Sequence, residues 1–305
     1  MRVVVTGAAG RLARVLLPAL CADRDIGRVT GIDRVAPEFR HSKFDPVIAD
    51  IAEPVAHAAV RGADALVNLA FVLFRERLPL DAMARTNVGA TRALLSAAGG
   101  AGVRSIVHMS SAAVYGRGVD VTEEAPFAPL PHFHYAQHKA AAEAWIAREL
   151  PQAAVLRPAV VLGRNAQPLL RQLAAAPFYV RMRDPQPRLQ CIHEDDVAQA
   201  VVRALQCRAS GAFNLAAPSS FSVRELVRAR KPRASGVPLP LARMALYVAW
   251  RAAGWGGEPG WLDGITESLT LDCRRARTLL GWRPRYEEWR DIVGCLSNPV
   301  QRPDE

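Results

Sequence analysis

Residues 2–13 read Arg-Val-Val-Val-Thr-Gly-Ala-Ala-Gly-Arg-Leu-Ala. The first five of these residues are mostly apolar and β-branched, which predicts a short buried strand. Gly7 and Gly10 end that run, and leucines follow at positions 16, 17 and 20, a helical spacing. A strand, a glycine turn and a helix in this order let the backbone approach a pyrophosphate, which lies on the positive N-terminus of the helix. The stretch therefore predicts a dinucleotide-binding α/β fold.

The glycine spacing departs from the usual fingerprint. It is Gly-x-x-Gly-x-x-Ala, and Ala13 stands at the third position, which serves close packing between helix and strand. One extra methyl group is a small change there. We expect Gly7, Gly10, Arg11 and Leu12 to contact the cofactor. The plain alternative is a glycine turn with no ligand.

A second predicted strand, residues 29–32, ends in Asp33. This residue lies about twenty positions after the turn, where a carboxylate binds the hydroxyls of the adenosine ribose. A carboxylate there also repels a 2′-phosphate, which favours NAD over NADP. Arg34 follows directly and could accommodate such a phosphate, so NADP stays the alternative.

Tyr135 and Lys139 stand four residues apart in a stretch typical of a helix, so they lie on one helix face. A neighbouring cation favours the phenolate of a tyrosine, whose pKa is ordinarily about 10, and the pair could exchange a proton near neutral pH. The chain has only two other lysines, Lys43 and Lys231. Such pairs also arise by chance on amphipathic helices, so this one gains weight from the cofactor turn upstream.

Three motifs occur in a fixed order: Thr-Gly-x-x-Gly-x-x-Ala at 6–13, Ser-Ser-Ala-Ala-Val-Tyr-Gly at 110–116, and Tyr135-x-x-x-Lys139. In this order they resemble the extended short-chain dehydrogenase/reductases, which include the sugar-nucleotide epimerases and dehydratases. Ile-His-Glu-Asp-Asp-Val at 192–197 and Leu-Gly-Trp-Arg-Pro at 280–284 extend the resemblance over nearly the whole chain. It implies a Rossmann fold, NAD as cofactor and hydride transfer at an alcohol.

The resemblance implies a role for several further residues. Around the cofactor, they are Asp50 and Ile51 against the adenine, Leu69 and Ala70 beneath the cofactor, and Pro158 facing the nicotinamide. Asn87 is expected to support the active site. The resemblance also implies that Tyr135 and Lys139 touch the cofactor.

The same resemblance assigns the chemistry. It implies that Ser111 orients the substrate oxygen, that Tyr135 as phenolate removes a proton, and that Lys139 lowers the pKa of Tyr135. Ser110 is the neighbouring alternative to Ser111, but adjacent strand residues point to opposite faces, so only one of them can face the cofactor. Capping of the strand end is the plain structural role for either serine.

Two departures from the family pattern limit the reaction. The dehydratases carry an acidic pair after the catalytic serine or threonine, whereas this chain has Ala112 and Ala113, which disfavours dehydration. Nucleotide-sugar enzymes usually place arginines against the diphosphate. Arg188 is one residue away from the first such position, and nothing basic precedes Asp272. A nucleotide-sugar substrate is therefore one option among several.

The 305-residue chain has a formal charge of +10, but its basic residues are spread out and lack interleaved aromatics, which argues against nucleic acid as a partner. No apolar run is long enough to span a bilayer, so no membrane partner is expected. Five cysteines without C-x-x-C spacing and a strand beginning at residue 2 suggest a cytoplasmic protein with reduced thiols. The seven histidines show no metal-ligand spacing, so no metal site is predicted.

The alternation of strand and helix patterns predicts a doubly wound parallel α/β sheet with a smaller, interleaved C-terminal substrate lobe. Residues 1–162 are expected to form the NAD-binding Rossmann domain, with returns to it at about 188–222 and 268–285. Residues 163–187 and 223–267 are assigned to the substrate-binding lobe. The resemblance further implies a homodimer, built from helices around 80–98 and 134–149.

Three functions remain open. The leading hypothesis is an NAD-dependent epimerase-like oxidoreductase that transiently oxidises a hydroxyl of a sugar or nucleotide-sugar. The alternative is an NAD(P)-dependent dehydrogenase or ketoreductase of a non-nucleotide alcohol, either a free sugar or a steroid-like molecule. A non-catalytic dinucleotide-binding regulator is the third, and it is disfavoured because the serine, tyrosine and lysine positions are all filled.

Overall fold

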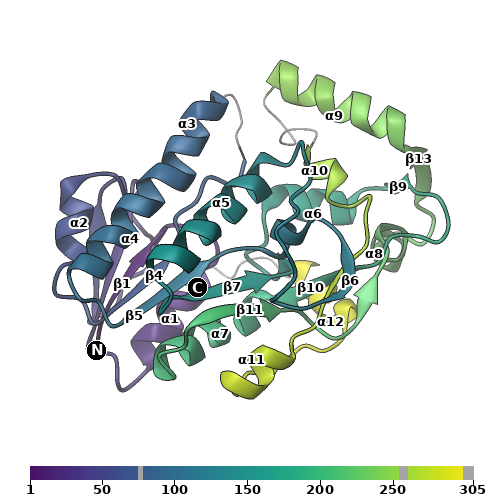
Figure 1. Ribbon diagram of the computed structural model, residues 1–305. Coiled ribbons are helices and arrows are strands. Elements are labelled where there is room, and N and C mark those ends of the chain that lie inside the picture. The colour runs from purple at the N-terminus through teal and green to yellow at the C-terminus, as the bar shows by residue number, and fades with distance from the viewer. Residues whose placement is uncertain (75–77, 254–259, 298–305) are drawn as a thin grey trace.

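The computed structural model describes residues 1–74, 78–253 and 260–297 (Figure 1). A seven-stranded sheet of parallel strands lies at its centre, in the order β11-β7-β5-β4-β1-β2-β3. The strands are β1 (Arg2–Thr6), β2 (Arg28–Asp33), β3 (Phe44–Ile48), β4 (Ala65–Asn68), β5 (Ser105–Met109), β7 (Ala154–Pro158) and β11 (Gly211–Leu215). The predicted Rossmann α/β fold is confirmed.

Helices cover both faces of this sheet, which is why its central strands are apolar on both sides. One apolar core joins the sheet to α1 (Ala13–Ala22), α7 (Glu194–Gln206) and α11 (Arg274–Leu279). A second core, on the opposite face, joins it to α2 (Pro54–Val60), α4 (Thr91–Gly100) and α5 (His134–Glu149). Helix α3 (Leu80–Ala84) continues through a π-helical turn (Arg85–Ala90) into α4.

A second, smaller sheet lies beside the first. It has the order β12-β10-β14-β6, and β8 also pairs with β10. Its strands are β6 (Gly118–Val121), β8 (Val160–Leu162), β10 (Leu189–His193), β12 (Ser220–Phe221) and β14 (Leu269–Leu271). Strand β10 has its partners β8, β12 and β14 within this second sheet, whereas β11 pairs with β7 in the main sheet. The predicted division into a Rossmann domain and a substrate-binding lobe stays a prediction.

The remaining elements form the outer part of the C-terminal half. They are α6 (Pro168–Ala175), β9 (Phe178–Arg181), α8 (Val223–Arg230), β13 (Ser235–Pro238), α9 (Leu239–Ala253), α10 (Gly260–Asp263), α12 (Trp289–Gly294) and a 3₁₀ turn at Cys295–Ser297. Another 3₁₀ turn, Ala112–Tyr115, follows β5 and packs into the core of the main sheet. Strands β9 and β13 pair in parallel. In Figure 1, α9 stands at the far edge of this half and α10 lies between it and α5.

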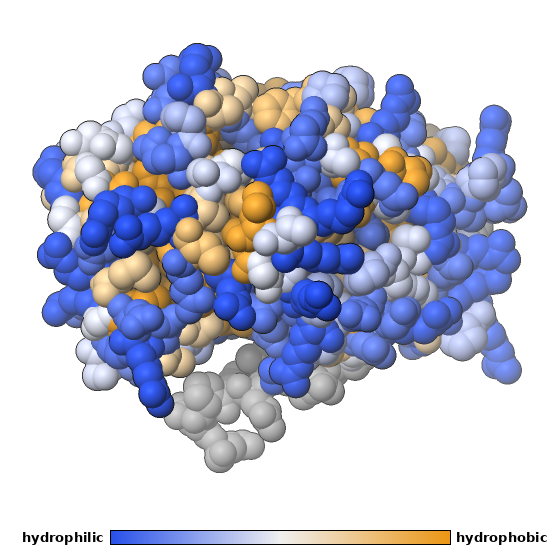
Figure 2. Space-filling view, turned by 60° about the horizontal axis from the view of Figure 1, so that its bottom comes forward, coloured by the Kyte–Doolittle hydropathy of each residue, from blue (hydrophilic) through white to orange (hydrophobic). Residues whose placement is uncertain are grey.

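In the part of the chain that the structure describes, no helix is long and apolar enough to cross a bilayer. Within the same residues, no group of three metal-ligating side chains comes together. Hydrophilic side chains cover most of the face shown in Figure 2, with apolar patches between them. The dimer contact predicted for residues 80–98 and 134–149 stays a prediction.

Candidate active site at the carboxyl edge of the main sheet

The glycine turn after β1 is held in a shape that only glycine fits well. Gly7 has a φ of +70°, and a Cβ there would lie 2.9 Å from the backbone nitrogen of Ala70. The Gly10 N–H donates to the Gly7 carbonyl at 2.9 Å, which closes the turn. Residue 70 follows β4, the neighbour of β1, so the two strand ends are packed backbone to backbone.

The turn leaves donors free at the start of α1. Within the described residues, the backbone N–H groups of Arg11 and Leu12 make no hydrogen bond. They precede a ten-residue helix, whose positive end attracts anions. Burial lowers the pKa of Arg11, and the neighbouring cations Arg14 and Arg171 lower it further. These groups fit the pyrophosphate of a dinucleotide.

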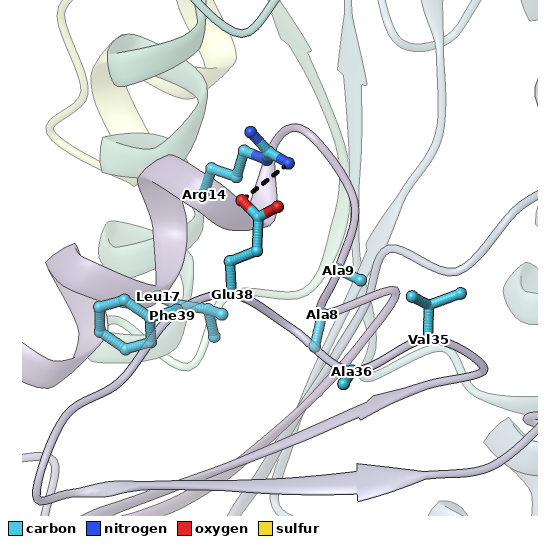
Figure 3. Close-up of a pocket in the computed structure, with 8 residues that line it drawn as sticks. All are labelled: Ala8, Ala9, Arg14, Leu17, Val35, Ala36, Glu38 and Phe39. Carbon is cyan, nitrogen blue, oxygen red and sulfur yellow. Dashed lines mark ion pairs between the residues drawn. The ribbon is translucent and has the colours of Figure 1, made fainter. Parts of the chain in front are cut away.

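Asp33, at the end of β2, is bound to the same turn. Its carboxylate accepts hydrogen bonds from the Ala9 N–H at 3.0 Å and the Val35 N–H at 3.2 Å. A cavity of about 110 Å³ opens next to it and is lined by residues of the turn, of α1 and of the segment after β2: Ala8, Ala9, Arg14, Leu17, Val35, Ala36, Glu38 and Phe39 (Figure 3). An ion pair between Arg14 and Glu38, 3.2 Å long, crosses it. This is the position expected for the adenosine ribose.

The next residues along the sheet edge continue the cofactor site. Arg34 is exposed and lies 4.0 Å from Asp50, and Ile51 is buried in the second core beside it. The geometry therefore brings Asp33, Arg34, Asp50 and Ile51 together at one end of the site.

The end of β4 is fixed by a chain of buried polar groups. The Thr6 hydroxyl donates to the Asn68 side-chain carbonyl at 2.6 Å and accepts the Ala70 N–H at 3.2 Å. This places Leu69 and Ala70 against the glycine turn. Asn87 holds the following segment, because its side chain bonds both the N–H (2.7 Å) and the carbonyl (3.0 Å) of Val72. Asn87, which is expected to support the active site, holds the backbone of the loop after β4 through these two hydrogen bonds.

The two serines after β5 point to opposite sides, as alternation along a strand requires. Ser110 is buried and donates to Glu143. Ser111 is half-buried, caps the 3₁₀ turn by accepting the Ala113 N–H at 3.2 Å, and shares a hydrogen bond with Tyr135. Ser111 is therefore the serine that meets the tyrosine. Pro158, at the end of β7, lies buried on the same edge of the sheet.

The electrostatics of Tyr135 differ from the expectation. Burial raises the pKa of Tyr135 to about 12, and only the hydrogen bond with Ser111 opposes the shift. Lys139 does not lower it, because the Lys139 ammonium lies 5.9 Å from the tyrosine ring centre and donates to the Met109 carbonyl at 2.5 Å. The Tyr135 hydroxyl is thus a phenol at neutral pH.

Lys139 is buried, and burial lowers its pKa to about 7, although Glu143 opposes the shift. Its ammonium lies 3.4 Å from the centre of the Phe71 ring, a cation–π contact. His108, fully buried on β5, bonds Asn68 at 3.0 Å. The pKa of His108 falls well below its ordinary value because of burial and, secondarily, because of Lys139.

A buried ion pair stands one turn further along α5, and the sequence reasoning missed it. Arg157 of β7 donates to Glu143 through Nε at 2.8 Å and through Nη2 at 2.6 Å, and both side chains are almost fully buried. Arg157 also donates to the Tyr115 hydroxyl at 2.6 Å, and Tyr115 donates to Asn214 at 2.8 Å. The i, i+4 spacing of Lys139 and Glu143 was the available signal.

An aromatic cluster around Tyr135 was also missed. It consists of Phe71, Phe74, Phe133, Tyr135 and Trp261, and it joins the loop after β4, the start of α5 and α10. Trp261 stacks on Tyr135 with ring centres 5.5 Å apart and planes at 30°. Trp261 is also 4.7 Å from both Phe74 and Phe133. Spacing along the sequence could not reveal a contact between residues more than 120 positions apart.

The C-terminal motifs contact each other away from Tyr135. The Trp282 indole donates to the Asp196 carbonyl at 2.9 Å, and the Asp196 carboxylate accepts the backbone N–H groups of Arg285 and Tyr286. These hydrogen bonds attach the start of α7 to residues 282–286. Arg188 is engaged elsewhere, because it donates to Glu225 at 2.6 Å and to the Ser220 carbonyl at 2.5 Å.

Comparisons with known proteins show which proteins this chain is similar to. Residues 3–216 match the model of the NAD dependent epimerase/dehydratase family. A UDP-glucose 4-epimerase of Mycolicibacterium smegmatis is 30% identical over 319 residues, covering 93% of this chain and 94% of the relative. A 3-diazoavenalumate denitrifying reductase of a Streptomyces species is 28% identical over 325 residues, covering 96% and 99%. A solved structure, MoeE5 in complex with UDP-glucose and NAD, is 23% identical with a TM-score of 0.75 and 97% coverage of both chains, and shows the same fold.

Proposed function

Since the chain belongs to the NAD dependent epimerase/dehydratase family, whose cofactor is NAD, we propose that it is an NAD-dependent oxidoreductase acting on an alcohol or ketone, with Tyr135 as the proton-transferring residue. The single observation that carries this proposal is the hydrogen bond between Ser111, which follows β5, and Tyr135, with Lys139 one turn further along α5. The positions of Ser111 and Tyr135 in the sequence do not by themselves show this contact.

The residues that would hold the cofactor are those of the sheet edge. The Arg11 and Leu12 N–H groups face the pyrophosphate site, Asp33 faces the ribose, and Ala70 lies against the turn. The nicotinamide supplies the hydride exchange when it is bound. Ser111 orients the substrate oxygen by hydrogen bonding, and Tyr135 gives a proton to that oxygen or takes one from it.

The Tyr135 hydroxyl holds the proton that the reduction of a ketone requires. With a pKa of about 12, its hydroxyl keeps its proton at neutral pH, so it can act as the acid that protonates the oxygen of a ketone under reduction. In the oxidative direction the same group must first lose its proton. We propose a net ketoreductase or dehydrogenase because Arg188, near the position where nucleotide-sugar enzymes place an arginine against the diphosphate, is engaged by Ser220 and Glu225. Residues 163–187 and 223–267 are proposed as the substrate-binding lobe. The latter segment supplies Trp261, which contacts Tyr135.

Epimerisation of a nucleotide-sugar is the second candidate. Its support is the 30% identity to a UDP-glucose 4-epimerase. Against it stand the engagement of Arg188 by Ser220 and Glu225, and the apolar residues Leu269 and Leu271 before Asp272. Neither position offers a cation to a diphosphate.

The test measures NADH oxidation by the purified protein with a panel of aldehydes and ketones, and epimer formation from UDP-glucose in the presence of NAD. Tyr135→Phe is expected to lower kcat for ketone reduction by about 10²- to 10⁴-fold. NAD affinity, measured by calorimetry, should change little. Ketone reduction by Tyr135→Phe within threefold of the wild-type rate would contradict the assignment. Epimer formation without net NADH consumption would favour the second candidate.

A further inference from the structure

The position of Trp261 is fixed by close packing around it. A Cβ on Gly260 would lie 1.7 Å from the His132 carbonyl oxygen, so the backbone of α10 presses directly on the segment before α5. Asp263, two residues after Trp261, forms a 2.6 Å ion pair with Arg243 of α9. The contact of Trp261 with Tyr135 is therefore set by the backbone of α10 and not by the ring alone.

The fold does not use the aromatic cluster as core. None of its five residues belongs to the apolar cores on the two faces of the main sheet or to those of the C-terminal half. Phe133 is buried, and the other four are half-buried. Large rings gathered outside the core, next to groups placed for chemistry, are typical of a ligand site.

The cluster determines what can lie next to the reacting oxygen. A substrate whose oxygen reaches the Tyr135 hydroxyl and Ser111 must place its neighbouring carbon atoms within a few ångströms of the tyrosine. Three other rings lie with their centres 5.5–5.8 Å from the Tyr135 ring: Phe71, Phe133 and Trp261. The face of Phe71 is already engaged by the Lys139 ammonium. Phe133 is buried, so the half-buried ring of Trp261 remains as the surface available to the body of the substrate.

We infer that the aromatic cluster binds a flat unsaturated ring, so that the substrate is an aryl ketone or the corresponding aryl carbinol. This inference rests on the proposed function for its chemistry. In the reductive direction a C–H bond forms at the carbonyl carbon, with the hydride coming from NADH. An O–H bond forms with the proton of the Tyr135 hydroxyl, the C=O double bond becomes single, and NADH is oxidised to NAD⁺. An aromatic ring gains about two- to tenfold in affinity for each ring it stacks on, beyond the effect of its buried area.

The experiment uses acetophenone and cyclohexyl methyl ketone, which differ in the unsaturation of the ring. The ratio of kcat/KM for the two ketones is measured for the full-length protein and for Trp261→Ala, Trp261→Phe and the control Trp250→Ala on α9. Comparing ratios between variants cancels the different intrinsic reactivities of the two ketones. Trp261→Ala should shift the ratio about tenfold against acetophenone. Trp261→Phe should shift it less, and Trp250→Ala should leave it unchanged.

Binding separates failure of this inference from failure of the proposed function. Saturation-transfer NMR of both ketones is recorded with Tyr135→Phe, alone and combined with Trp261→Ala. Acetophenone binding that is lost on removing Trp261 supports the cluster as a ring site even if no ketone is reduced. An unchanged ketone ratio in folded Trp261→Ala overturns the inference while leaving hydride transfer intact. UDP-glucose turned over in preference to both ketones overturns it as well.

Discussion

At the β1–β2 side of the sheet edge, which we call the backbone half, the groups placed for binding are mainly backbone atoms. At the β5–β7 side, the side-chain half, they are side-chain atoms. The turn at Gly7 is possible because glycine has no Cβ to clash with Ala70. The Asp33 carboxylate accepts hydrogen bonds from the backbone N–H groups of Ala9 and Val35. Across the sheet, Ser111, Tyr135 and Glu143 act through oxygen atoms aimed at partners from other elements. Substitutions that add atoms should therefore disrupt the backbone half most, and substitutions that remove side-chain atoms should disrupt the side-chain half most.

The largest effect is expected in the side-chain half, from Glu143→Ala. The substitution leaves Arg157 buried without its carboxylate partner, which should lower the free energy of unfolding by about 3–5 kcal/mol. Urea denaturation measures it. The control is Glu149→Ala on the same helix, which removes an exposed ion pair with Arg148 and should cost less than about 1 kcal/mol. Equal losses in the two variants would mean that the buried network adds nothing to stability.

In the backbone half, Gly7→Ala should weaken NAD binding by on the order of a hundredfold. A φ of +70° costs a non-glycine residue about 1–2 kcal/mol, and the added Cβ would lie 2.9 Å from the Ala70 nitrogen. The turn must shift to relieve both, which moves the Arg11 and Leu12 N–H groups. Calorimetry with NAD measures the change. Gly100→Ala, whose Cβ would meet nothing within 4 Å, should bind NAD like the wild type.

The same contrast explains what the sequence could predict. The backbone half is local: a glycine turn, a helix start and an aspartate at a fixed distance occupy residues 2–33, so the sequence pattern predicts them. Ser111, Tyr135 and Lys139 are predicted because the family motif orders them along the chain. Glu143–Arg157 and Trp261–Tyr135 depend on packing between distant segments, which periodicity does not encode.

The pKa of Tyr135 shows most clearly what the sequence pattern cannot predict. The i, i+4 spacing correctly places Lys139 on the same helix face, but it does not say where the ammonium points. The Met109 carbonyl and the Phe71 ring draw it away from the tyrosine hydroxyl. Burial then dominates, and it raises the pKa of the phenol while it lowers that of the amine.

Lys139 gives the third prediction, a pH dependence of stability. Its pKa is about 7 in the folded protein, below the ordinary lysine value of 10.5. Below pH 7 both states carry the proton, so the cost of burying the cation is constant. Between pH 7 and 9 the folded protein loses the proton while the unfolded chain keeps it, so this cost is relieved and stability rises by about 2 kcal/mol.

Lys139→Met removes that titration. The buried thiols Cys191 and Cys273, whose pKa values burial raises to about 12, are shared by both proteins, and their effect cancels in the difference. The stability of wild type relative to Lys139→Met should therefore increase from pH 7 to pH 9 in urea denaturation. Parallel pH profiles would mean that Lys139 keeps its charge in the folded state.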